Sequence, residues 1–188
     1  MLRSELAPGY PENQAQEPSW RASSGTAAVL GLRRMRMDAP PTTAYLMLGQ
    51  RCMRNCAFCT QARQSSANAA ALSRITWPSF SRDAIIDALS TAAETGTIKR
   101  VCFQSTVGRK HVEEARDAVH ALSLTCDLPI SACIVPGDIS DVALLLESGA
   151  QRVTIALDAA SEEVYRRVKG PDWNRTLNLL EQSAQAFP

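Results

Sequence analysis

Short apolar segments alternate along the chain with segments of helical periodicity, and this alternation constrains the fold more than any other feature. Four apolar segments have the length and composition of buried strands: 43–48, 98–106, 128–136 and 150–160. The expected helices span 26–37, 81–96, 111–125, 139–149, 161–170 and 172–187. Strand–helix units with short links form a parallel sheet covered by helices, so the sequence predicts an α/β fold.

Four such units fit either a doubly wound sheet or the first part of a (β/α) barrel. Four parallel strands cannot close a barrel, and the last of them would remain an open edge. We therefore expect that the chain lacks the C-terminal part of the barrel or is completed by a partner. Residues 1–25 are rich in Pro, Gln and Ser and are predicted to be a flexible leader, followed by one core domain over 26–188.

Composition narrows the class of protein. The net charge is +1, which gives no sign of nucleic-acid or membrane binding. No apolar run reaches the ~20 residues of a membrane span, and the N-terminus lacks the apolar core of a secretory signal. We expect a cytoplasmic protein. Because disulfides are rare in the reducing cytosol, the six cysteines indicate metal or redox chemistry.

Three of these cysteines lie within eight residues, in the segment CMRNCAFC directly after the first predicted strand. A structural zinc site needs four ligands, commonly from two Cys-x2-Cys pairs, and only Cys56 and Cys59 form such a pair. A [4Fe–4S] cluster has four irons, so three cysteines would leave one iron open for a substrate or cofactor. The pattern favours the cluster and keeps zinc as the alternative.

The pattern Cys52-x3-Cys56-x-Phe58-Cys59 after a first strand resembles the signature of the radical S-adenosylmethionine (SAM) superfamily. The resemblance implies the N-terminal part of a parallel barrel, with a [4Fe–4S] cluster on the three cysteines and Phe58 in the cofactor site. It also implies one-electron cleavage of SAM to methionine and a 5′-deoxyadenosyl radical that abstracts hydrogen from carbon. The cofactors carry this chemistry, so no side chain is singled out as catalytic.

Features farther along the chain resemble biotin synthase and the related two-component lipoyl synthases. These are Gln61 after the last cysteine of the loop, Arg100 and Cys102 on the second predicted strand, and Cys133 on the third. The resemblance implies that Cys102 and Cys133 ligate an auxiliary cluster that donates sulfur. It implies sulfur insertion into an unactivated C–H bond of a small molecule or an octanoyl-lysyl protein. A flavodoxin or ferredoxin would supply electrons, and a second radical SAM subunit is a possible partner.

The same resemblance suggests residues for SAM itself. Asp158 ends the fourth predicted strand, where relatives contact the SAM ribose, and Arg175 matches an arginine that pairs with the SAM carboxylate. Gln104 and Ser105 stand where many relatives place a Gly-Gly-Glu sequence that receives the SAM amino group. Because this chain departs from that sequence, the two polar side chains are expected to take its place.

Two other functions stay open. One is a radical SAM mutase or a hydrogenase-maturation type of enzyme without sulfur insertion, in which Cys102 and Cys133 are core residues that only pack. The other is a non-catalytic metal-binding module. We expect the first function, sulfur insertion, with these two as alternatives.

Overall fold

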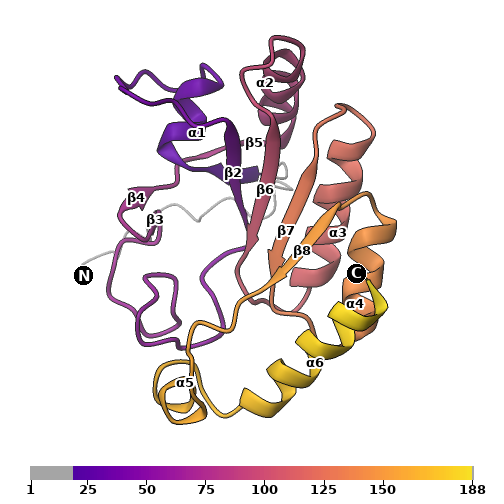
Figure 1. Ribbon diagram of the computed structural model, residues 1–188. Coiled ribbons are helices and arrows are strands. Elements are labelled where there is room, and N and C mark those ends of the chain that lie inside the picture. Colours follow the sequence, from indigo (N-terminus) through magenta and orange to yellow (C-terminus); the bar gives the residue numbers. More distant parts are fainter. Residues whose placement is uncertain (1–18, 188) are drawn as a thin grey trace, which may run out of the picture.

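A six-stranded, mostly parallel sheet organises the computed structural model, which describes residues 19–187 (Figure 1). The strands follow the order β5-β1-β2-β6-β7-β8. The parallel strands are β2 (Thr43–Leu48), β6 (Arg100–Ser105), β7 (Ile130–Ile134) and β8 (Arg152–Ile155). All four were predicted from the sequence, and the α/β class is confirmed.

Alternation along the strands gives the sheet two different faces. One face carries the apolar residues of β2 and β6, such as Leu46, Val101 and Phe103, each fully buried. The other face carries polar and half-exposed residues, among them Cys102, Gln104 and Cys133. The sheet therefore has a covered apolar face and an open polar face.

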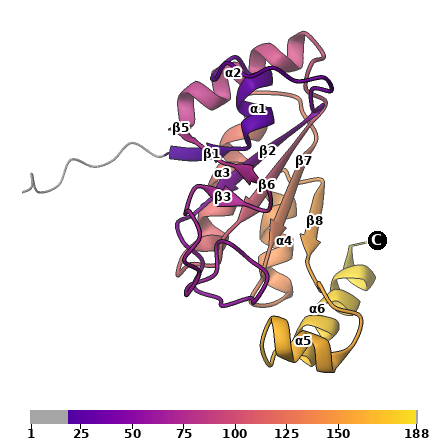
Figure 2. The same ribbon diagram turned by 90° about the vertical axis from the view of Figure 1, so that its left-hand side faces the viewer.

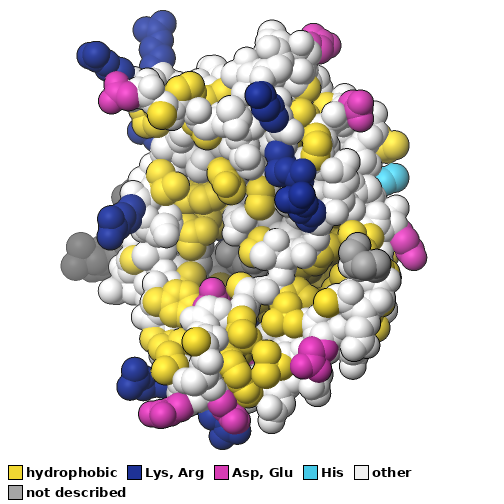
Figure 3. Space-filling view, viewed as in Figure 1, with side chains coloured by type: hydrophobic (Ala, Val, Ile, Leu, Met, Phe, Trp, Pro, Cys, Tyr) yellow, Lys and Arg dark blue, Asp and Glu magenta, His cyan; other side chains and the backbone are white. Residues whose placement is uncertain are grey.

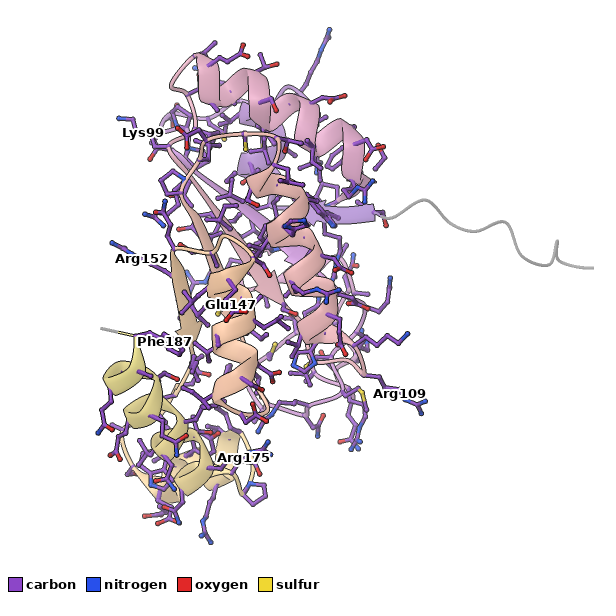
Figure 4. All side chains as sticks on the ribbon, turned by 90° about the vertical axis from the view of Figure 1, so that its right-hand side faces the viewer. Lys99, Arg109, Glu147, Arg152, Arg175 and Phe187 are labelled. Carbon is purple, nitrogen blue, oxygen red and sulfur yellow. The ribbon has the colours of Figure 1, made fainter. Side chains whose placement is uncertain are left out.

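Helices α2 (Arg82–Glu94), α3 (His111–Ser123) and α4 (Ile139–Glu147) connect the parallel strands, and α3 and α4 lie along one side of the sheet (Figure 2). Figure 4 shows Lys99 and Arg152 extending from the opposite side, away from these helices. Helices α5 (Glu162–Val168) and α6 (Trp173–Ala186) follow β8 at its carboxyl end. No helix among the described residues is long and apolar enough to cross a membrane.

The expected leader is corrected at its end. Residues 1–18 lie outside the described residues, but Ser19–Ala22 forms strand β1, antiparallel to β2. Trp20 is 6% exposed and its ring meets that of Phe103 edge-on, with centroids 5.2 Å apart. The Pro- and Ser-rich composition of this segment gave no indication of a strand. The strand packs into the core through only two buried side chains, Trp20 and Ala22.

One predicted helix is shorter than expected, and three short strands were not predicted. The helix predicted over 26–37 is the shorter α1 (Ser24–Val29), which Ser23 caps by accepting a hydrogen bond from the Thr26 amide. The polar stretch after the cysteines contains a small hairpin of β3 (Ala71–Leu72) and β4 (Ile75–Thr76). Strand β5 (Ser79–Ser81) pairs antiparallel with β1. These short elements are held by pairing partners, which local sequence does not reveal.

Replacing Trp20 by alanine tests whether β1 belongs to the core. We expect Trp20→Ala to lower the free energy of unfolding by about 3 kcal/mol, because it leaves a cavity against Phe103. Tyr45→Ala removes an aromatic ring that is 42% exposed on the open face and should cost less than about 1 kcal/mol. Urea denaturation measures both values. Equal small losses would contradict a structural role for β1.

Candidate functional site

A pocket lies at the carboxyl ends of the parallel strands, the place where ligands bind in open parallel sheets. Its wall includes the three cysteines of the loop after β2 and the ends of β6, β7 and β8. The predicted site residues that line it are Cys52, Cys56, Cys59, Phe58, Gln104, Ser105, Cys133 and Asp158. In Figure 3 the face seen in the view of Figure 1 is hollowed near its centre, with hydrophobic side chains around much of the hollow.

The cysteine loop leaves β2 through a turn that requires glycine. Gly49 has φ +79°, and a Cβ atom there would lie 2.5 Å from the Thr106 hydroxyl oxygen. The loop is then tied to the end of β6, because the Met53 amide donates to the Val107 carbonyl at 2.8 Å. In return, the Val107 amide donates to the Cys52 sulfur at 3.4 Å. This N–H···S bond stabilises negative charge on the sulfur.

Gln61 acts as an internal brace of the loop. Its side chain is 2% exposed, and its amide nitrogen donates to the carbonyls of Ala69 and Ala71 at 2.8 and 2.6 Å. Its amide oxygen accepts from Arg21 of β1 at 3.2 Å. The glutamine was singled out for its likeness to biotin synthase, and in this structure it holds the segment after the cysteines against β1.

The first turns after β8 hold the loop from the other side. The Arg54 guanidinium forms an ion pair with Asp172 at 2.8 Å, immediately before α6. The Ala57 amide donates to the Val168 carbonyl at 2.8 Å, at the end of α5. Residues more than a hundred positions apart thus fix the loop, and the sequence offered no signal for either contact.

Neighbouring charges both raise and lower the pKa of Cys56. Burial raises the pKa of its thiol above the usual value, while the positive charges of Arg54 and Lys169 lower it and the neighbouring Cys59 and Cys52 raise it. The three sulfurs are therefore close enough to affect one another. Arg54 and Lys169 thus oppose the effect of burial at Cys56.

The donor set fits an iron–sulfur cluster better than a single ion. Between residues 19 and 187, no group of three or more His, Cys, Asp or Glu side chains is arranged to hold one metal ion. In a [4Fe–4S] cluster each cysteine ligates a different iron, so the thiolates need not converge on one point. The three cysteines are free, half-buried and on one pocket wall, with an N–H donor to one sulfur.

Asp158 has an unusual backbone conformation. It has φ +61°, a left-handed conformation that Asp tolerates better than most residues. Its carboxylate forms an ion pair with Lys169 at 2.7 Å. Both side chains line the pocket. Sequence reasoning chose Asp158 and missed Lys169, because a lysine at a helix end ordinarily faces solvent.

The two strand cysteines lie on the open face of the sheet. Gln104 pairs in register with Cys133, and its amide nitrogen donates to the Cys102 sulfur at 3.2 Å. The pKa of Cys133 is raised to about 11, mainly by burial and in smaller part by Cys102 and Asp158, while Lys169 opposes the rise. Burial also raises the pKa of Cys102, against the hydrogen bond from Gln104 and the charge of Arg100. Cys133 lines the pocket, whereas Cys102 lies farther along the sheet.

Arg175 is placed apart from the cysteine pocket. It is on α6, is exposed, and donates to the Gly137 carbonyl at 2.6 Å after β7. It lines a smaller neighbouring pocket that shares Arg54 and Lys169 with the larger one. Figure 4 shows it at the end of the molecule formed by α6 and the start of α4. Its expected pairing with the SAM carboxylate stays a prediction.

A sequence model of the radical SAM superfamily matches residues 46–188, which is most of the chain. The chain belongs to the radical SAM superfamily. Members of this superfamily use a [4Fe–4S] cluster and SAM. No curated protein is similar enough to the chain to count as a match.

Two solved structures share the fold. Methylornithine synthase (PylB) matches with a TM-score of 0.61 and 16% identity, covering 76% of this chain and 41% of its own. The [FeFe]-hydrogenase maturase HydG from Carboxydothermus hydrogenoformans matches with a TM-score of 0.61 and 18% identity, covering 78% of this chain and 34% of its own. The chain thus spans about two fifths or less of the length of these proteins. The likeness concerns the fold.

Gln61→Ala should loosen the cysteine loop, because it removes two donated hydrogen bonds and leaves Arg21 without one acceptor. We expect a loss of about 1–3 kcal/mol in the free energy of unfolding and less bound iron after anaerobic reconstitution. Gln64→Ala is the matched control, since Gln64 is exposed on the same loop and its side chain accepts an exposed hydrogen bond from Asn55. If both variants bind as much iron as the unchanged protein, Gln61 does not brace the site.

Proposed function

We propose that the chain forms the cluster- and SAM-binding part of a radical SAM enzyme that inserts sulfur into an unactivated C–H bond. The observation that carries the proposal is the shared pocket of Cys52, Cys56 and Cys59 with a fourth cysteine, Cys133, on the sheet. When bound, the cluster and SAM supply a 5′-deoxyadenosyl radical that removes hydrogen from the substrate carbon. The loop cysteines would hold the cluster as its thiolate ligands.

The polar side chains at the strand ends have the chemistry to hold SAM. Gln104 and Ser105 end β6, and their amide and hydroxyl groups suit the SAM amino group. The carboxylate of Asp158 suits the ribose hydroxyls, provided that it leaves its ion pair with Lys169. Phe58 is 59% exposed on the pocket wall, where its ring offers a flat apolar surface to an adenine base. Arg175 remains the candidate for the SAM carboxylate.

Sulfur insertion rests on Cys102 and Cys133 as ligands of an auxiliary cluster. The two thiols lie on neighbouring strands of the open face, and only Cys133 reaches the wall of the cysteine pocket. Proposed substrates are a small molecule or an octanoyl-lysyl protein. Proposed partners are an electron donor of the flavodoxin or ferredoxin type and a second radical SAM subunit.

A second candidate keeps the radical chemistry without sulfur insertion, as a mutase or a hydrogenase-maturation type of enzyme. The fold likeness to methylornithine synthase and to HydG favours keeping it. In that case the high pKa of Cys133 reflects a buried thiol that only packs.

The reconstituted protein, reduced with dithionite, should convert SAM to 5′-deoxyadenosine, measured by liquid chromatography. Cys59→Ala should reduce the yield at least tenfold, because it removes one of three cluster ligands. Cys126→Ala is the matched control, since this cysteine packs beside helix α3 and is outside the pocket. A yield that is the same in all three proteins, or no product from any of them, would contradict the proposed chemistry.

Replacing Cys102 and Cys133 together by alanine separates the two candidates. Sulfur insertion predicts that the double variant loses the iron and sulfide of a second cluster while keeping the loop cluster. The second candidate predicts unchanged iron content. Iron and sulfide analysis with Mössbauer spectroscopy gives the count, and unchanged values would remove sulfur insertion from consideration.

A further inference from the structure

Lys169 is a buried cation at the pocket that holds the cysteines. Its side chain is 5% exposed, although lysine is almost never buried without a partner. The ammonium pairs with the Asp158 carboxylate at 2.7 Å and donates to the Ala156 carbonyl. It also lies 5.3 Å from the centre of the Tyr165 ring, in a cation–π contact. Three groups thus fix one positive charge in place.

The two arginines of helix α5 differ from Lys169, which directly follows the helix, in their exposure to solvent. Arg166 and Arg167 are exposed, and Arg166 pairs with Glu162 one turn earlier on the helix surface. Neither lines the pocket, whereas Lys169 lines it together with Cys56 of the loop and Cys133 of the sheet. The main chain beside Lys169 touches the loop as well, because the Val168 carbonyl accepts from the Ala57 amide.

Burial of Lys169 strengthens the electrostatic interactions of its charge. Two charges at a given distance interact several times more strongly in a partly buried site than in water. The partner Asp158 is 38% exposed, so water screens the carboxylate more than it screens the ammonium. The pair therefore leaves a net positive field at Cys56, whereas at Cys133 the Asp158 carboxylate has a larger effect than the Lys169 ammonium.

We propose that Lys169 is a positioning residue whose fixed charge, held between Cys56 and Cys133, sets how readily a cluster on the loop cysteines accepts an electron. The proposal rests on the proposed function for the presence of the cluster. A positive charge stabilises the reduced, more negative cluster and raises its midpoint potential. Asp158 carries the opposite charge at the same place and should act with the opposite sign.

Spectroelectrochemical titration without SAM tests the proposal on the reconstituted protein. Lys169→Met should shift the equilibrium toward the oxidised cluster by three- to tenfold, a fall of about 30–60 mV for one electron. Lys169→Arg keeps the charge and should stay close to the unchanged protein. Asp158→Asn should raise the potential. Arg167→Met removes an exposed charge from the same helix and is the control without a shift.

The directions of the potential shifts in Lys169→Met and Asp158→Asn separate a charge effect from a structural effect. If Lys169 serves only to hold Asp158 and α5 together, Lys169→Met and Asp158→Asn break the same ion pair and shift the potential in the same direction. That result, or a Lys169→Met potential equal to the unchanged value, overturns the inference. Neither result touches the proposed function, which fails on its own if SAM is not cleaved.

The apoprotein provides a second reading that does not depend on cluster assembly. Lys169→Met should slow the reaction of Cys56 and Cys133 with iodoacetamide about threefold, and Asp158→Asn should speed it, as followed by peptide mass spectrometry. Cys126 lies outside the pocket and serves as an internal control with an unchanged rate. If the rate at Cys56 and the rate at Cys133 are each unchanged across all variants, the inference is overturned even if no cluster forms.

Discussion

The site is built around four cysteine sulfur atoms on the wall of one half-buried pocket. Burial and mutual repulsion both oppose the thiolate form at Cys56. Arg54 and Lys169 supply opposite charge, and the Val107 amide supplies a hydrogen bond to Cys52. These groups come from the loop, from the end of β6 and from the end of α5. The elements that hold the cysteine loop in place thus also supply the positive charges and the hydrogen bond next to its sulfur atoms.

The parallel sheet brings these distant groups together. The carboxyl ends of β2, β6, β7 and β8 lie at one edge, so the loops that follow them meet there. Strand β1, antiparallel to β2, adds support that the parallel strands do not provide, because Arg21 reaches Gln61 and the Gly49 carbonyl from it. The open polar face of the sheet then carries Cys133 at the pocket wall and Cys102 farther along the neighbouring strand.

Much of this arrangement could be predicted from the sequence because its signals are local. Apolar runs and helical spacing predicted the four parallel strands and their helices, which the structure confirms. The spacing of Cys52, Cys56 and Cys59 predicts a cluster loop, and all three residues line one pocket. Strand β1 and the position of Lys169 could not be predicted. A strand of four residues and a lysine before a glycine have ordinary local sequence, and only their tertiary partners make them part of the core and of the site.

The proposed function requires that the three loop cysteines hold a cluster with one iron open to SAM. Electron paramagnetic resonance of the anaerobically reconstituted, dithionite-reduced protein tests this requirement, with spectra recorded before and after SAM is added. A reduced [4Fe–4S] signal that changes on adding SAM is the predicted result, because SAM would bind the iron that no cysteine holds. A cluster signal that is the same with and without SAM would contradict it.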